Sequence, residues 1–173
     1  MLIVLSGLPG SGKSTIAVGL ARRLGAPLLA VDRIESALLR AGVPMSFETG
    51  VAAYEVAGAL AAVQVGLGLD VVVDAVNSLE IARDTWRRTD APRCVIEVAC
   101  SDADEHRRRL AARVRDLDGF PEPTWAYVEQ RRREWEPWTE ERLVLDSVDD
   151  VDANVDRALD WIATCRTGPG PRA

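Results

Sequence analysis

Short runs of apolar residues alternate along this chain with longer stretches whose apolar positions recur every three or four residues. The short runs, such as Leu-Ile-Val-Leu at 2–5 and Val-Val-Val at 71–73, are apolar at successive positions, which is typical of strands with both sheet faces covered. The expected strands are 2–5, 28–31, 70–74, 94–99 and 142–145. The expected helices are 13–24, 35–40, 51–67, 79–88, 102–117, 124–133 and 151–165. Strands separated by helices predict parallel βαβ units, and therefore an α/β fold built as a three-layer α/β/α sandwich.

The spacing of these elements indicates one domain, over 1–167, with a helical lid. The lid is expected at about 102–133, where a Pro- and Gly-containing segment joins two charged helices, because such a composition suits a mobile element. The end of the chain, 168–173, is expected to be disordered. No uncharged apolar run reaches about 18 residues, which excludes a membrane-spanning helix. Because the N-terminus lacks the basic region of a secretory signal, we expect a cytoplasmic protein.

Composition narrows the choice of partner. The formal net charge is −6, whereas proteins that bind nucleic acid usually carry a basic surface. This balance disfavours a nucleic-acid partner, although a local basic region could still hold one nucleotide.

The chain has 3 Cys and 1 His, scattered and without a CxxC pair, which argues against a disulfide framework and a zinc site. All but one of the 21 basic residues are arginines, so the position of the single lysine, Lys13, is informative.

A phosphate-binding loop follows the first expected strand. Residues 7–14 match G-x-x-x-x-G-K-[ST] at every fixed position and open the next helix. Its backbone N–H groups can surround a phosphate, while Lys13 reaches the β- and γ-phosphates of ATP and the Ser14 hydroxyl binds Mg²⁺. Thr15 is placed to hydrogen-bond the α-phosphate. The residues expected to hold the nucleotide are Gly7, Leu8, Pro9, Gly10, Ser11, Gly12, Lys13, Ser14 and Thr15.

Two aspartates end expected strands at the same edge of the sheet. Asp74 closes an apolar run and is expected to hold Mg²⁺, directly or through water, because the carboxyl ends of parallel strands face the ligand crevice. Asp32 closes the run at 28–31 and could accept the proton of an attacking hydroxyl. Asp32 is equally placed to cap the next helix, and of these two roles we favour the catalytic one.

These features together resemble a group of P-loop kinases that includes the 5′-kinase domain of polynucleotide kinase, chloramphenicol phosphotransferase, gluconate kinase and zeta toxins. The resemblance spans nearly the whole chain and rests on GLPGSGKST at 7–15, Asp32, VVVDAVN at 71–77 and an arginine-rich lid. It implies a P-loop NTPase fold with a five-stranded parallel sheet in the order 2-3-1-4-5, Asp32 as general base, and lid arginines on ATP. The sequence departs from several members, which place an arginine a few residues beyond this aspartate; here Arg33 is adjacent and Glu35 follows.

Several polar side chains are candidates for contacting the acceptor. Asn77 and Arg83 follow the third expected strand, and Arg33 adjoins Asp32, so we expect all three to bind substrate. Asn77 is equally placed to cap the next helix, and Arg83 to lie on a solvated helix face. Tyr54 is expected to pack in the core, as is Phe47, with the wall of the acceptor pocket as the alternative for both.

The lid is the second source of positive charge. Arg109 and Arg113 are four residues apart and share a helix face, so we expect them to close over the transferring phosphate and the adenine. Arg115 belongs to the same basic cluster. His106, the single histidine, is expected on the lid surface rather than at the chemistry.

The sequence therefore predicts an ATP- and Mg²⁺-dependent kinase that transfers the γ-phosphate to a hydroxyl of a small molecule, such as an antibiotic, a sugar acid or a nucleoside. The expected catalytic residues are Lys13, Asp32, Arg109 and Arg113. Two alternatives stay open. One is a polynucleotide 5′-hydroxyl kinase, and the other is a nucleotide-dependent switch or ATPase without an acceptor. The sequence does not select the acceptor, ATP over GTP, or the oligomeric state.

Overall fold

A computed structural model describes residues 1–113, 117 and 120–167 of the chain. The strands are β1 (Leu2–Ser6), β2 (Leu28–Ala30), β3 (Val71–Asp74), β4 (Arg93–Ala99) and β5 (Leu143–Asp146). The helices are α1 (Lys13–Leu24), α2 (Val31–Arg40), α3 (Phe47–Gly66), α4 (Glu80–Arg87), α5 (Ala103–Ala112), α6 (Trp125–Arg133) and α7 (Val151–Thr167). None of the helices in these ranges is long and apolar enough to cross a membrane.

The strands form one sheet in the order β2-β3-β1-β4-β5, and all of its pairings are parallel. This confirms the strand order that the family resemblance implies. The central strand, β1, pairs Leu5 with Asp74 on one side and with Ile96 on the other. Because every β1 residue is buried, the run of consecutive apolar residues marks a strand covered on both faces.

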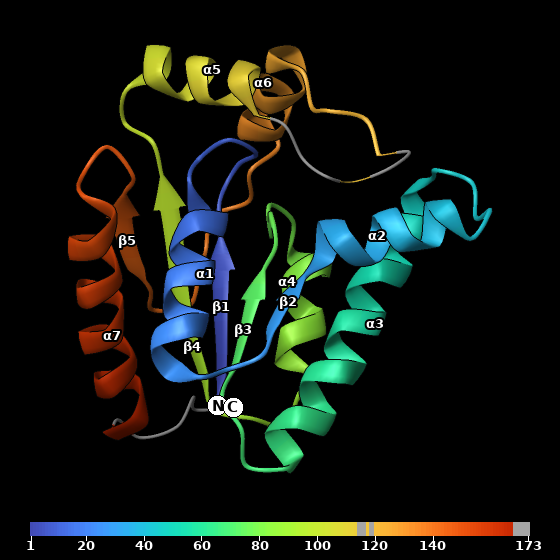
Figure 1. Cartoon of the computed structure of the whole chain (residues 1–173). Coiled ribbons are helices and arrows are strands. Elements are labelled where there is room, and N and C mark those ends of the chain that lie inside the picture. The colour runs from blue at the N-terminus through green and yellow to red at the C-terminus, as the bar shows by residue number, and fades with distance from the viewer. Residues whose placement is uncertain (114–116, 118–119, 168–173) are drawn as a thin grey trace.

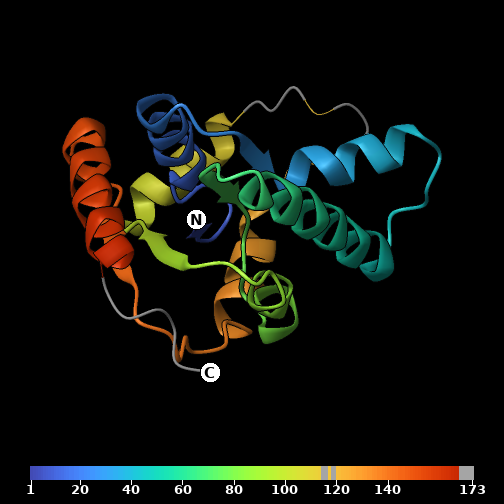
Figure 2. The ribbon, with the colours of Figure 1, turned by 90° about the horizontal axis from the view of Figure 1, so that it is seen from below.

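Helices cover both faces of the sheet, which confirms the three-layer α/β/α architecture (Figure 1). On one face, Ile3 and Leu5 pack with residues of α1 and α7. On the other face, Leu2 and Val4 pack with α3 and with Trp86 of α4. Successive side chains of β1 thus enter opposite layers, as the two-residue period of a strand requires. Figure 2 shows α1 and α7 together, away from α3 and α4.

Close packing between α3 and α4 depends on one glycine. A Cβ atom at Gly58 would lie 2.7 Å from Cγ2 of Thr85, which is closer than two carbon atoms can approach without displacement. The absence of a side chain at this position lets the two helices meet, and α4 is thereby fixed beside the carboxyl end of β3.

The boundaries of the elements differ from those expected from the sequence at three places. The second strand ends at Ala30, and α2 begins at Val31, whose side chain is buried in the core. The third helix begins at Phe47, capped by Ser46, whose Oγ accepts from the Thr49 N–H at 3.2 Å. The expected helix 102–117 ends at Ala112.

The expected lid helices, α5 and α6, lie across the carboxyl edge of the sheet (Figure 1). Thr124 caps α6 as expected, its Oγ1 accepting from the Tyr127 N–H at 3.2 Å. Parts of the sequence prediction lie outside the described residues, namely Arg115, 118–119 and the tail 168–173.

Candidate active site

The loop after β1 adopts a backbone that only glycine tolerates at its fixed positions. Gly7 has φ +156°, and a Cβ there would lie 2.4 Å from the Val98 carbonyl oxygen. Gly12 has φ +90° and directly precedes the first residue of α1. The loop therefore brings successive N–H groups and a helix N-terminus to one point, an arrangement that attracts phosphate.

Lys13 and Asp74 meet at the base of this loop. Both side chains are buried, and Nζ of Lys13 lies 3.8 Å from Oδ1 of Asp74. That Oδ1 atom has no hydrogen-bond partner within the described residues. A buried carboxylate oxygen without a donor costs free energy, so a cation at this point would stabilise it.

The residues here fit a Mg²⁺ ion held together with a nucleotide. Ser14 supplies a hydroxyl in the first turn of α1, next in the chain to Lys13, which lies 3.8 Å from the carboxylate of Asp74. The described ranges hold no group of three or more His, Cys, Asp or Glu suited to a metal. Mg²⁺ in P-loop sites needs no such group, since phosphate oxygens and water complete its octahedral shell.

Asp32 lies in the first turn of α2, not at its N-cap, which is Ala30. Its Oδ2 atom lies 3.8 Å from Nη2 of Arg113, the residue that follows α5. The structure thus brings together the expected general base and one expected lid arginine from two distant segments. The alternative in which Asp32 caps the helix is wrong.

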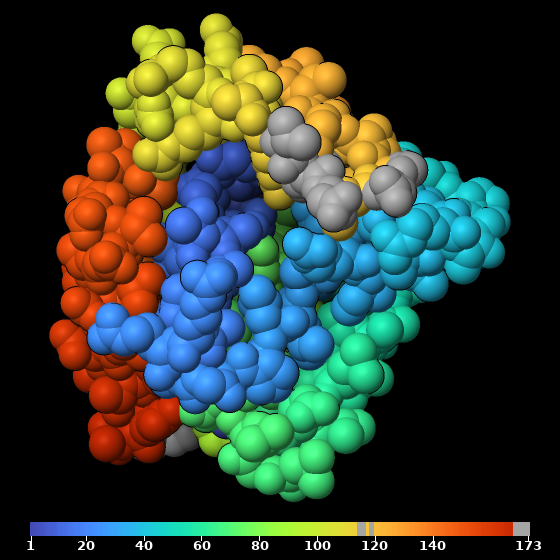
Figure 3. Space-filling view, viewed as in Figure 1, coloured from blue at the N-terminus to red at the C-terminus, as the bar shows by residue number. Residues whose placement is uncertain are grey.

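A cavity of about 670 Å³ joins Asp32 to the P-loop. It lies among α2, α3, α4 and the lid segment 120–131, and Pro9 of the P-loop contributes to its wall. In Figure 3 the surface is hollowed beneath α5 and α6, beside the N-terminal residues. Tyr54 and Phe47 line this cavity. Tyr54 also packs against the buried core, as expected, whereas the core position expected for Phe47 is wrong. Phe47 is 63% exposed.

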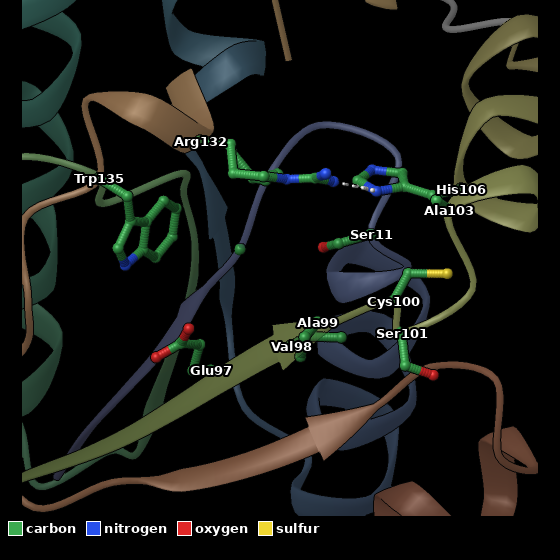
Figure 4. Close-up of a pocket in the computed structure, with 12 residues that line it drawn as sticks. Ser11, Glu97, Val98, Ala99, Cys100, Ser101, Ala103, His106, Arg132 and Trp135 are labelled. Atoms are coloured by element: carbon green, nitrogen blue, oxygen red, sulfur yellow. Dashed lines mark hydrogen bonds between the residues drawn. The ribbon is translucent and has the colours of Figure 1, made fainter. Parts of the chain in front are cut away.

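A second cavity of about 420 Å³ lies on the β4 side of the P-loop. Gly7, Leu8 and Ser11 line it from the loop, and Trp135 lines it from beyond α6. Figure 4 shows Arg132 and His106 pointing toward each other across the loop. The phosphate-binding loop is thus bounded by a cavity on each side.

His106 is buried, and its expected place on the lid surface is wrong. Its Nε2 atom is hydrogen-bonded to the Pro9 carbonyl at 2.8 Å, and its ring contacts Trp125 edge-on with centroids 5.3 Å apart. The histidine therefore joins α5 to the P-loop and to α6. Only its helical position was evident from the sequence, because the contact with Pro9 spans 97 residues.

Burial lowers the pKa of His106 below its usual range, and the nearby Arg132 and Arg109 charges act in the same direction. The folded protein thus keeps the ring neutral while the unfolded chain binds a proton below about pH 6.5. We expect a contribution to stability that is complete above this pH and is lost as pH falls toward the lowered folded-state pKa. Melting temperatures across this range should fall more steeply for wild type than for His106→Gln, which keeps an N–H donor. Parallel curves would contradict the assignment.

Arg109 bridges the lid and the nucleotide end of the fold. Its Nη1 donates to Ser147 Oγ at 2.8 Å, and its Nε donates to Glu105 at 2.6 Å. Nη1 also lies 3.7 Å from where a Cβ of Gly12 would be. The side chain is thus adjacent to the last turn of the P-loop.

Asn77 has a structural role in this fold. The backbone of Asn77 adopts φ 55°. Its side-chain Nδ2 donates to the Leu5 carbonyl at 3.1 Å, and its Oδ1 accepts from Trp86 Nε1 at 2.7 Å. Its N–H donates to the hydroxyl of Tyr54 at 3.2 Å, and burial raises the pKa of that hydroxyl. The side-chain amide is committed inside the protein, so the prediction that it contacts substrate is wrong. The N-cap of α4 is Leu79, which also removes the capping alternative.

Arg83 is likewise structural, and its expected contact with substrate is wrong. The residue is 1% exposed. Its guanidinium donates to Asn77 O at 2.9 Å, Pro137 O at 2.9 Å, Glu80 Oε1 at 2.7 Å and Glu136 O at 2.5 Å. It also stacks 4.1 Å from the ring centroid of Trp138. Arg83 therefore ties α4 to the segment after α6.

The third residue expected to bind substrate, Arg33, is exposed and lines neither described cavity.

Replacing Arg83 with alanine should lower the free energy of unfolding by about 3 kcal/mol, because buried carbonyl acceptors lose their donor. Arg33→Ala is the matched control, and its exposed position predicts a change within about 0.5 kcal/mol. Urea unfolding followed by circular dichroism measures both. Equal stability of the two variants would contradict the structural role of Arg83.

Comparison with known proteins gives a family and several structures of similar fold. The model of the AAA domain family matches residues 2–135. No curated protein matches the chain.

Three solved structures illustrate the likeness. A sugar kinase from Janibacter sp. HTCC2649 is 20% identical, with a TM-score of 0.73 and 94% of each chain covered. Kti12 from Chaetomium thermophilum, in complex with ADP-AlF3, is 22% identical, with a TM-score of 0.72, covering 97% of this chain and 100% of that one. The APS kinase CysC of Mycobacterium tuberculosis, in complex with AMPPNP and APS, is 19% identical, with a TM-score of 0.67, covering 94% and 96%. These structures share the nucleotide-binding P-loop fold.

Proposed function

The chain belongs to the AAA domain family, and from this premise we propose that it is an ATP- and Mg²⁺-dependent kinase acting on a hydroxyl of a small molecule. One observation carries the proposal. Asp32, placed to act as a base, lines the same cavity as Pro9 of the P-loop, and that cavity measures about 670 Å³. A cavity of this size beside a phosphate-binding loop suits transfer to a small molecule.

In this reaction the acceptor oxygen attacks the γ-phosphorus, the bond to the β–γ bridging oxygen breaks, and ADP leaves. Lys13 and the loop N–H groups bind the phosphates, and Asp32 orients the hydroxyl and takes its proton. Arg113, 3.8 Å from Asp32, lies where it can balance charge on the transferring group. Ser14 and Asp74 would hold Mg²⁺, which when bound neutralises phosphate charge.

The comparisons support a phosphotransferase, since two of the similar structures are a sugar kinase and an APS kinase. Kti12 is not named as a kinase, so an ATPase without an acceptor is the alternative that the experiment must distinguish from a kinase. The net charge of −6 counts against a polynucleotide acceptor.

Release of ADP from ATP·Mg²⁺ over a panel of acceptors tests the proposal. The panel contains sugars, sugar acids, nucleosides, aromatic alcohols and a 5′-hydroxyl oligonucleotide. Stimulation by one class of small molecule, with a phosphorylated product seen by mass spectrometry, supports the kinase. ADP release that is slow and indifferent to every acceptor would refute it in favour of an ATPase.

Arg109→Ala should raise KM for ATP about tenfold, the effect of losing one charge-assisted hydrogen bond, because this side chain lies beside Gly12. Arg108→Ala provides the control. Both arginines pair with Glu105, yet the side chain of Arg108 is 73% exposed against 33% for Arg109. Steady-state kinetics at saturating acceptor separate the two. A similar KM for both variants would remove Arg109 from the nucleotide site.

A further inference from the structure

The wall of the Asp32 cavity is mainly apolar and aromatic. The apolar side chains that line it are Val31, Met45, Phe47, Val51, Tyr54, Val76, Leu79, Ile81, Ala82, Phe120 and Tyr127. They come from α2, α3, the start of α4 and the lid, so four separate segments direct apolar surface into one space. A polar acceptor such as a sugar would find few partners for its hydroxyl groups along such a wall.

Several of these residues are exposed although they are large. Met45, Phe47, Ile81 and Tyr127 are all among the exposed large hydrophobic residues, and all four face this cavity. Isolated exposed apolar residues are common on protein surfaces, whereas their concentration in one hollow marks a surface that binds an apolar partner. Residues from facing elements could close upon such a ligand from both sides.

The arginines that line the cavity are already paired with carboxylates. Its wall carries four carboxylates, Asp32, Glu35, Glu55 and Glu122, against two guanidiniums. Each guanidinium already has a carboxylate partner: Arg88 contacts Glu55, and Arg131 lies 3.0 Å from Glu134. Asp32 in turn lies 3.8 Å from Arg113. An anionic acceptor would therefore have to displace an existing ion pair to gain a cation from these residues.

We propose that the acceptor is a hydroxyl compound with an apolar or aromatic body and no negative charge. This inference rests on the proposed kinase function and adds the chemical class of its substrate. The hydroxyl lies at the Asp32 end of the cavity, and the apolar body extends toward Phe47, Ile81 and Tyr127. A neutral compound displaces no ion pair, and a cationic compound meets four carboxylates along the wall.

Three aromatic alcohols of similar size separate the effect of charge: 3-phenylpropane-1,2-diol is neutral, phenylalaninol is cationic and 3-phenyllactate is anionic. Glycerol and gluconate lack the apolar body. Binding to the protein is measured by ligand-observed NMR with and without ADP·Mg²⁺, and phosphoryl transfer is measured by ADP release. We expect the neutral and cationic aromatic alcohols to bind at least about tenfold more tightly than 3-phenyllactate, glycerol or gluconate, a difference of about 1.4 kcal/mol.

A matched pair of variants ties the binding to this cavity. Ile81 and Val63 are both exposed aliphatic residues of helices, at 53% and 60%, but only Ile81 lines the cavity. Ile81→Arg should weaken binding of the neutral diol about tenfold and reduce the discrimination against 3-phenyllactate. Val63→Arg should change neither, and KM for ATP should stay constant in both variants.

The outcomes distinguish this inference from the function on which it rests. Selective binding of the uncharged and cationic probes without added ADP release would support the ligand class and refute the kinase. Phosphorylation of gluconate or 3-phenyllactate in preference to the others would support the kinase and overturn the ligand class. Failure of every aromatic probe to bind, or equal effects of the two variants, would also overturn it.

Discussion

Replacing Asp32 with asparagine is expected to lower kcat for phosphoryl transfer by a factor of about 10² to 10⁴, the usual contribution of a positioned general base. Asparagine keeps the shape of the side chain but cannot take the proton of the attacking hydroxyl. Because Asp32 lies on α2, outside the P-loop, the Kd of ATP should change little. Single-turnover transfer and nucleotide binding, measured on the same preparation, give the two quantities.

Glu35→Gln is the matched control for this change. Glu35 lies on the same helix and lines the same cavity, so its replacement removes equal charge without removing the proposed base. We expect kcat to fall far less than in Asp32→Asn. If ADP release in Asp32→Asn equals that of wild type, no hydroxyl is being activated and the acceptor-free ATPase gains support. If both variants lose activity equally, the effect is one of cavity charge.

Replacing Lys13 with methionine is expected to lower kcat/KM for ATP by a factor of about 10² to 10³, comparable with loss of one preorganised donor to a reacting group. The same change leaves the buried carboxylate of Asp74, 3.8 Å away, without its cation. Such a buried charge costs about 3–5 kcal/mol of stability. Thermal unfolding should therefore show a lower melting temperature for Lys13→Met, an effect separate from its loss of activity.

The double variant Lys13→Met with Asp74→Asn separates these two effects. It removes the uncompensated charge, so most of the lost stability should return, while kcat/KM stays low because both the phosphate donor and the metal carboxylate are missing. Recovery of activity together with stability would show that Lys13 acts only by holding the fold. Failure of the double variant to regain stability would contradict the pairing of Lys13 with Asp74.

The sequence predicted the strands and helices of the fold and the backbone of the glycine-rich loop, because these depend on local patterns. Consecutive apolar residues at 2–5 and 71–73 indicate strands covered on both faces, and the structure confirms them as neighbours in the sheet. The fixed glycines at 7 and 12 are required by the backbone of the loop itself. Lys13 follows them directly in the chain, so its position beside the loop follows from the same short segment.

The roles of Arg83, Asn77 and His106 were decided by tertiary structure. Arg83 donates to carbonyls 53 and 54 residues away, and His106 contacts a carbonyl 97 residues away. Single-sequence patterns do not specify such pairings, and a polar residue after a strand has the same local signal whether it faces a ligand or the core. The sequence could place these side chains on their elements but could not identify their partners.

The cavity beside Asp32 was likewise decided by tertiary structure. Phe47, Tyr54 and Ile81 form one wall only because α3 and α4 pack side by side over the sheet, and the lid segment must then lie opposite. By itself the sequence determined which segments form strands and where the glycine-rich loop with Lys13 lies, because both depend on short-range patterns. The strand order followed only from the family resemblance. The tertiary structure alone decided which side chains line the cavity beside Asp32, because that depends on how separate segments pack against one another.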